Sequence, residues 1–300
     1  MTAARNASAP DAMEPNTTVR PSAIAGTWYP ASEAALRRAI EGHLAAASAA
    51  AKAAALPGPA VALVSPHAGY SFSGGVAASA YAQVSGAAHH RVVLLGPLHR
   101  PIPGSRLGAV MVPIETSFRT PLGETPVDRA FLADLGERVH LTPVRGDTEH
   151  SLEIELPFLQ VALRSFGLVP LLMGEHIAAP GAVGRLDRLA AALARLADDK
   201  TLFVASTDLS HLNNYEDVVR IDRRLCDLVA AFDVDGLAAA LADEAVQACG
   251  AAGLVTALRA AQLLGAQGCR VLNYAASGDV TGDRRPGTYT VGYLAAAAYR

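Results

Sequence analysis

The chain has 300 residues, 51% of them hydrophobic, so it can bury a large core as one α/β domain or two small ones. A net charge of −3 with only 18% charged residues excludes a broad basic face for nucleic acid. Residues 53–90 contain no Asp, Glu, Lys or Arg, but prolines and glycines interrupt them too often for a membrane span. The N-terminus has no apolar core of a secretory signal. We therefore expect a cytoplasmic protein without membrane or nucleic-acid partners.

Strands alternate with helices along the chain, which predicts an α/β fold with a mostly parallel central sheet flanked by helices. Residues 1–20 are expected to form a disordered arm and residues 21–300 a single domain. Helices are predicted at 33–54, 76–84, 128–138, 151–166, 180–197, 216–232, 234–242 and 250–264. Strands are predicted at 60–64, 91–95, 109–114, 168–173, 201–206, 270–275 and 289–298, the last of them a candidate antiparallel strand.

Two neighbouring buried strands each end in a histidine. The first strand is followed by Ser65-Pro66-His67, and the second by Gly96-Pro97-Leu98-His99. Ligands in α/β sheets are held at the carboxyl ends of the strands. Either histidine alone is more often a hydrogen-bonding loop residue than a ligand. Together they favour a metal site, because neutral imidazole suits Zn, Fe, Cu and Ni.

Cysteine usage is sparse, with only Cys226, Cys249 and Cys269, which argues against a disulfide framework. We assign Cys226 and Cys269 to the core. Cys249 directly precedes a predicted helix, where the helix amino-terminus is expected to lower the thiol pKa and favour the thiolate. It is either a small buried hydrophobe or the third ligand of a His/His/Cys site with an open fourth position.

Other polar residues near these strand ends allow two interpretations each. Asp208 and His211 form an acid–base pair, with the aspartate orienting the imidazole, or Asp208 caps a turn and His211 is half exposed. Glu149 and His150 line the site or merely begin a helix. Of Glu153 and Glu155, which fall on different helix faces, one is expected to be solvated surface.

A set of motifs stands in the chain in the order IAGTWYP, SPHAGYSFSG, LLGPLHR, TEHSLEIELPFL, STDLSH, the CG of QACGAAG, and NYAASGD. Together, from about Pro21 to the C-terminus, they resemble the Memo family and follow the family's order. Microbial members of that family are called AmmeMemoRadiSam system protein B. The resemblance implies a fold like that of the class III extradiol dioxygenases of the LigB type.

The resemblance also implies roles for individual residues. His67, His99 and Cys249 would be metal ligands, and Asp208 and His211 further site residues, His211 matching the acid–base histidine of the dioxygenases. Those enzymes hold Fe(II) with two histidines and a carboxylate, so a thiolate in the third place argues against ring cleavage. Arg100 stands where many members have a second histidine, and either binds an anionic substrate or faces solvent.

Three functions follow from these observations. The first is an iron-dependent redox enzyme of unknown substrate with a dioxygenase-like pocket, in which Arg100, Glu149 and His150 contact substrate. The second is a non-catalytic module that binds iron, copper or a partner. The third is a zinc-type hydrolase in which the metal activates water. The expected partners are a small-molecule substrate or a peptide, and a radical-SAM protein of the same system.

Overall fold

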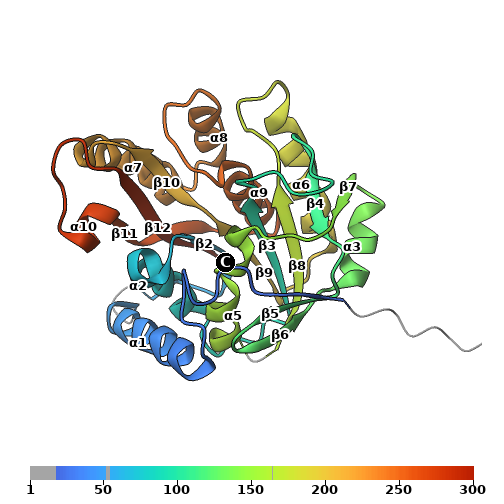
Figure 1. Ribbon diagram of the computed structural model, residues 1–300. Coiled ribbons are helices and arrows are strands. Elements are labelled where there is room, and N and C mark those ends of the chain that lie inside the picture. The colour runs from blue at the N-terminus through green and yellow to red at the C-terminus, as the bar shows by residue number, and fades with distance from the viewer. Residues whose placement is uncertain (1–17, 52–54, 164) are drawn as a thin grey trace, which may run out of the picture.

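The computed structural model describes residues 18–51, 55–163 and 165–300, which form an α/β fold (Figure 1). The large sheet consists of β2 (Ala60–Ser65), β3 (Arg91–Pro97), β4 (Val110–Pro113), β7 (Leu141–Val144), β8 (Gly167–Met173), β9 (Thr201–Ser206), β10 (Asp208–Leu212), β11 (Gly268–Ala276) and β12 (Thr290–Tyr299). Its strand order is β10-β12-β2-β9-β3-β8-β4-β7, and β11 also pairs with β12. This mixed sheet, parallel through its centre and flanked by helices, confirms the predicted fold class.

The helices form two groups against this sheet. They are α1 (Glu33–Ala51), α2 (Tyr70–Tyr81), α3 (Arg129–Gly136), α4 (His150–Glu153), α5 (Leu156–Ala162), α6 (Ala182–Leu196), α7 (Tyr215–Ala230), α8 (Val234–Ala242), α9 (Ala251–Leu263) and α10 (Ser277–Thr281), with a 3₁₀ turn, η1 (Ala82–Val84). Helices α1, α2 and α5 pack together, and α9 packs with α6 and α8 (Figure 1). None of the described helices is long and apolar enough to cross a bilayer.

The central parallel strands position the site. Every residue of β2 and β9 is buried, as expected for strands covered on both faces. In the register of β2 with β9, Ser65 lies opposite Ser206, and in that of β3 with β9, Leu95 lies opposite Ala205. The three strands therefore end at one edge of the sheet, which brings the segments after them together.

Some predicted elements have the observed bounds, whereas others begin elsewhere or were not predicted. Strand β9 and helix α8 have the predicted bounds, and β12 is antiparallel to β2, as predicted. Helix α2 begins at Tyr70, ahead of the predicted start at residue 76. Residues 52–54 of the predicted first helix lie outside the described residues. We did not predict β10, because its sequence, DLSHL, lacks a continuous apolar run.

The segment predicted as one helix over 151–166 is two short helices, α4 and α5, separated at Ile154-Glu155. Both Glu153 and Glu155 are buried, so the expectation that one of them is solvated was wrong. Glu155 accepts a hydrogen bond from the Tyr81 hydroxyl at 2.6 Å, and burial raises the pKa of this carboxyl to about 7. The break between the helices turns both carboxylates inward.

The chain enters the fold through a small three-stranded sheet of β1 (Val19–Arg20), β5 (Ser117–Thr120) and β6 (Gly123–Pro126). Residues 1–17 of the expected arm lie outside the described residues. Val19 and Arg20, which we assigned to that arm, pair with Ser117 and Phe118. The Arg20 guanidinium is buried and forms ion pairs with Asp147 and Glu153. Strand β1 is thereby tied to the segment that precedes and includes α4.

Candidate metal site

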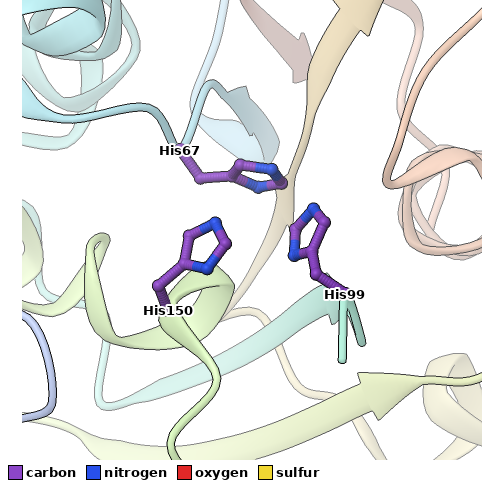
Figure 2. Close-up of side chains that lie close together, drawn as sticks. All are labelled: His67, His99 and His150. Atoms are coloured by element: carbon purple, nitrogen blue, oxygen red, sulfur yellow. The ribbon is translucent and has the colours of Figure 1, made fainter. Parts of the chain in front are cut away.

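Three imidazoles converge at the edge of the sheet where the central parallel strands end (Figure 2). His67 follows β2, His99 follows β3, and His150 is the first residue of α4. One ring nitrogen from each lies within 4.8 Å of the other two. Three imidazole nitrogens at this spacing could hold a metal ion and leave a coordination position open. His67 is buried, whereas the other two rings are partly accessible.

The Glu149 carboxylate orients two of the three rings. Its Oε1 lies 3.0 Å from Nδ1 of His99 and 3.0 Å from Nδ1 of His150. Burial alone would raise the pKa of Glu149, but hydrogen bonds from His150 and His99 outweigh it and hold that pKa well below its usual range. An ionised carboxylate accepts the Nδ1 protons, so Nε2 of both rings is left for a ligand. Such carboxylate–histidine pairs are typical of metal sites.

The Ser206 hydroxyl fixes the orientation of the third ring, that of His67. Ser206 Oγ donates to the Ser151 carbonyl at 2.6 Å and therefore accepts the Nδ1 proton of His67 at 2.9 Å. This network assigns the unprotonated nitrogen of His67 to Nε2. Burial, together with the nearby His99 and His150, holds the pKa of His67 well below its usual value. The ring is thus neutral at pH 7, the form that binds metal.

Cys249 lies beside His67, with Sγ 3.1 Å from its Nε2. The sulfur also accepts the backbone N–H of Asp208 at 3.2 Å. It is not one of the three residues whose ligand atoms all lie within 4.8 Å of one another. Burial, and secondly the Asp208 charge, raises the pKa of the Cys249 thiol, so the expected lowering by the helix amino-terminus was wrong. Loss of solvation outweighs the helix dipole here.

Asp208 and His211 have separate partners. Asp208 is buried, and its Oδ1 accepts the backbone N–H of His67 at 2.8 Å. Burial raises the pKa of Asp208 to about 7 in spite of that hydrogen bond. His211, on β10, has its Nδ1 2.8 Å from the Tyr289 hydroxyl, and burial followed by the charge of His99 lowers its pKa. Asp208 thus holds the loop that carries His67, and Tyr289 orients the His211 ring.

A cavity of about 400 Å³ opens beside the imidazoles, a size that suits a small molecule. Its polar lining comprises the three histidines, Asp208, His211, Thr27 and Ser71, and its aromatic lining comprises Trp28, Phe72 and Tyr289. The Trp28 ring lies 4.2 Å from that of His150, centroid to centroid. Of the residues expected to contact substrate, only His150 lines this cavity. Arg100 is exposed outside the lining, and Glu149 lies behind the rings.

A family model, described as Memo-like protein, matches residues 20–297. The chain belongs to the Memo family. It is 34% identical to a MEMO1 family protein of Methanopyrus kandleri over 92% of this chain and 97% of that protein, and 33% identical to one of Methanothermobacter thermautotrophicus over 92% and 98%. A MEMO1 family protein of Thermotoga maritima is 32% identical over 81% of this chain and 87% of that protein. The resemblance inferred from the motifs is therefore confirmed.

Among solved structures, an uncharacterized protein of Escherichia coli K12 aligns with 78% of this Memo-family chain and 98% of its own, at 12% identity and a TM-score of 0.49. That likeness is too slight to support a conclusion.

Removal of the Glu149 charge should weaken metal binding without unfolding the protein. We expect Glu149→Gln to lower affinity for Zn²⁺ or Fe²⁺ by about 10–100-fold, the usual cost of losing a carboxylate behind histidine ligands. Affinity is measured by competition with a chromophoric chelator. Glu124→Gln, at an exposed carboxylate paired with Arg119, is the matched control and should leave affinity unchanged. Equal affinity in both variants would contradict the assigned role of Glu149.

Proposed function

We propose that this Memo-family protein binds a divalent metal ion through Nε2 of His67, His99 and His150 and a small-molecule substrate in the adjoining cavity. The observation that carries the proposal is the orientation of the rings. Glu149 and Ser206 accept the Nδ1 protons, and one nitrogen from each ring lies within 4.8 Å of the other two. We infer iron as the metal and redox chemistry as the reaction, with copper or zinc as alternatives. Bound iron would supply one-electron chemistry and a Lewis acid at its open positions.

The residues around the proposed metal position would bind substrate and move protons. His211 lines the cavity with a lowered pKa, so at pH 7 its neutral ring can accept a proton at Nε2 while Nδ1 pairs with Tyr289. Asp208 keeps the His67 loop in place. Trp28, Phe72 and Tyr289 are partly exposed and line the cavity, where they would pack against an apolar or aromatic substrate.

A second candidate function is supported by the sulfur of Cys249. A thiol 3.1 Å from a ligand nitrogen of His67 is close enough to join the coordination of a soft ion such as Cu(I) after a small side-chain movement. In that case the protein would be a copper-binding module without turnover. The two functions differ in metal preference and in whether oxygen is consumed.

Trp28 provides a direct test, because it is the only tryptophan and its ring contacts that of His150, 4.2 Å away between centroids. Anaerobic titration with Fe²⁺ or Co²⁺ should quench its fluorescence and saturate at one ion per chain. In His67→Ala the saturable quenching should disappear while the circular dichroism stays unchanged. Trp28→Phe should lose the signal but keep its metal, measured by plasma emission. Quenching that never saturates, or that persists in His67→Ala, would rule out the proposed site.

Oxygen uptake separates the functions once the metal is known. Consumption of oxygen with catechol-like compounds by the iron-loaded protein would support a redox enzyme. Tight Cu(I) binding without turnover would support the module. Tight zinc with cleavage of esters or amides would instead support the hydrolase expected as an alternative from the sequence.

A further inference from the structure

A second cavity, of about 440 Å³, lies at the β7 edge of the large sheet and shares no lining residue with the metal cavity. Its walls come from the loop before β4, the turn between α3 and β7, and the first half of α6, elements that gather at one side of the molecule (Figure 1). Nothing in the proposed metal chemistry uses these residues.

The lining is strongly basic. It contains Arg106, Arg138, Arg185 and Arg188 with a single acidic residue, Glu175, so its formal charge is +3 in a chain whose net charge is −3. The Glu175 carboxylate is already paired with the Arg185 guanidinium, which donates hydrogen bonds of 2.7 and 2.9 Å to it. In the described part of the chain, the other three arginines form no ion pair with a carboxylate. Three unneutralised guanidinium groups around one cavity favour an anionic ligand.

Apart from these charged residues, His140 and Thr142, the lining is apolar, with Val110, Val139, Leu186 and Leu189 among the contacts. One wall is held firmly, because Gly108 N–H donates to the Gly174 carbonyl at 2.8 Å and Gly174 N–H donates to the Ala109 carbonyl at 2.9 Å. The cavity thus combines a fixed apolar surface with a cluster of positive charge. A ligand that matches both has an apolar body and a compact, multiply charged anionic group.

We propose that this cavity binds a small organic phosphate, with the phosphate between Arg106, Arg138 and Arg188 and the organic part against Leu186 and Leu189. A phosphate monoester carries nearly two negative charges at pH 7 and accepts several hydrogen bonds, so it matches this charge better than a monocarboxylate does.

Calorimetry with four probes tests the ligand class: phenyl phosphate, inorganic phosphate, benzoate and benzyl alcohol. Phenyl phosphate should bind at least about tenfold more tightly than any of the other three, since only it supplies both the dianion and the apolar ring. Arg138→Gln and Arg188→Gln should each weaken it about tenfold or more. Arg195→Gln, at an exposed arginine of α6 outside the lining, is the matched control and should change nothing.

The Trp28 metal titration is run on every variant and should be unchanged, which shows that the protein is folded and separates this site from the metal site. Equal weak binding of all anions, or phenyl phosphate binding that Arg188→Gln leaves intact, would overturn the proposal. So would binding of an acidic peptide at this cavity with no binding of phenyl phosphate.

Discussion

His150→Ala should abolish stoichiometric binding of Fe²⁺ or Zn²⁺ as completely as His67→Ala does. Each variant removes one of three imidazoles whose ligand nitrogens lie within 4.8 Å of one another. The expected loss of affinity exceeds about 100-fold, more than the 10–100-fold cost of removing a residue that only orients a ligand. The measurements are metal content after anaerobic loading and affinity by chelator competition.

Two comparisons make this result specific. His90→Ala removes a partly exposed histidine just before β3, at the opposite end of that strand from His99, and should keep the wild-type metal content. Cys249→Ser should retain most Fe²⁺ and Zn²⁺ affinity but lose much more of its Cu(I) affinity, because thiolate is a soft ligand. The reverse pattern, with metal retained in His150→Ala and lost in Cys249→Ser, would make the thiol the third ligand.

The convergence of His67 and His99 follows from features that a single sequence displays well. Continuous apolar runs mark buried parallel strands, and such strands end at one edge of the sheet, so the residues after them are brought together. The observed register of β2, β9 and β3 has this consequence. The motifs then carried the family resemblance, which the family model confirms.

The contribution of His150 could not be predicted in the same way, because it comes from a helix of a single turn. Helix α4 is held against the sheet by a hydrogen bond from Ser151 Oγ to the Pro97 carbonyl at 2.7 Å. A side chain on Gly96 would lie 2.7 Å from Ser151 Oγ, so the glycine of the GPLH motif is what allows this approach. Neither the hydrogen bond nor the close contact produces a periodic pattern in the sequence. Gly96 alone marks the position of the close contact.

Electrostatic effects that depend on tertiary contacts could not be predicted from the sequence either, and the pKa of Cys249 is an example. From sequence, only the helix amino-terminus beside the thiol is visible, and it favours the thiolate. Burial and the nearby Asp208 depend on tertiary contacts, and they raise the pKa instead. The buried environment of Glu153 is likewise set by a residue far away in the chain, Arg20.

Arg20→Met should destabilise the protein by about 3–5 kcal/mol, because it leaves the buried Asp147 and Glu153 carboxylates without their cation. The guanidinium lies 2.6 Å from each of them and also donates to the Glu149 carbonyl. Since these contacts hold the segment that supplies Glu149 and His150, metal affinity should fall as well. Unfolding in denaturant and the Trp28 titration measure the two effects.

The pH dependence of the stability loss in Arg20→Met identifies the buried ion pairs as its cause. In the wild-type protein, burial alone would raise the pKa of Glu153, but Arg20 and the hydrogen bonds to it lower that pKa below its ordinary 4.5. The stability it contributes is therefore present above about pH 4.5 and is lost as the pH falls through the folded pKa. The deficit of Arg20→Met should accordingly be largest near neutral pH and shrink in acid.

Arg37→Met is the matched control, because it breaks an exposed ion pair with Glu33 and should cost at most about 0.5 kcal/mol. If Arg20→Met were no more destabilising than this control, or if its deficit stayed constant with pH, the buried ion pairs would not be what anchors β1. A loss of metal affinity in Arg20→Met at temperatures where the variant is fully folded would show that this anchor, more than 120 residues away in the chain from its carboxylates, also positions the imidazole of α4.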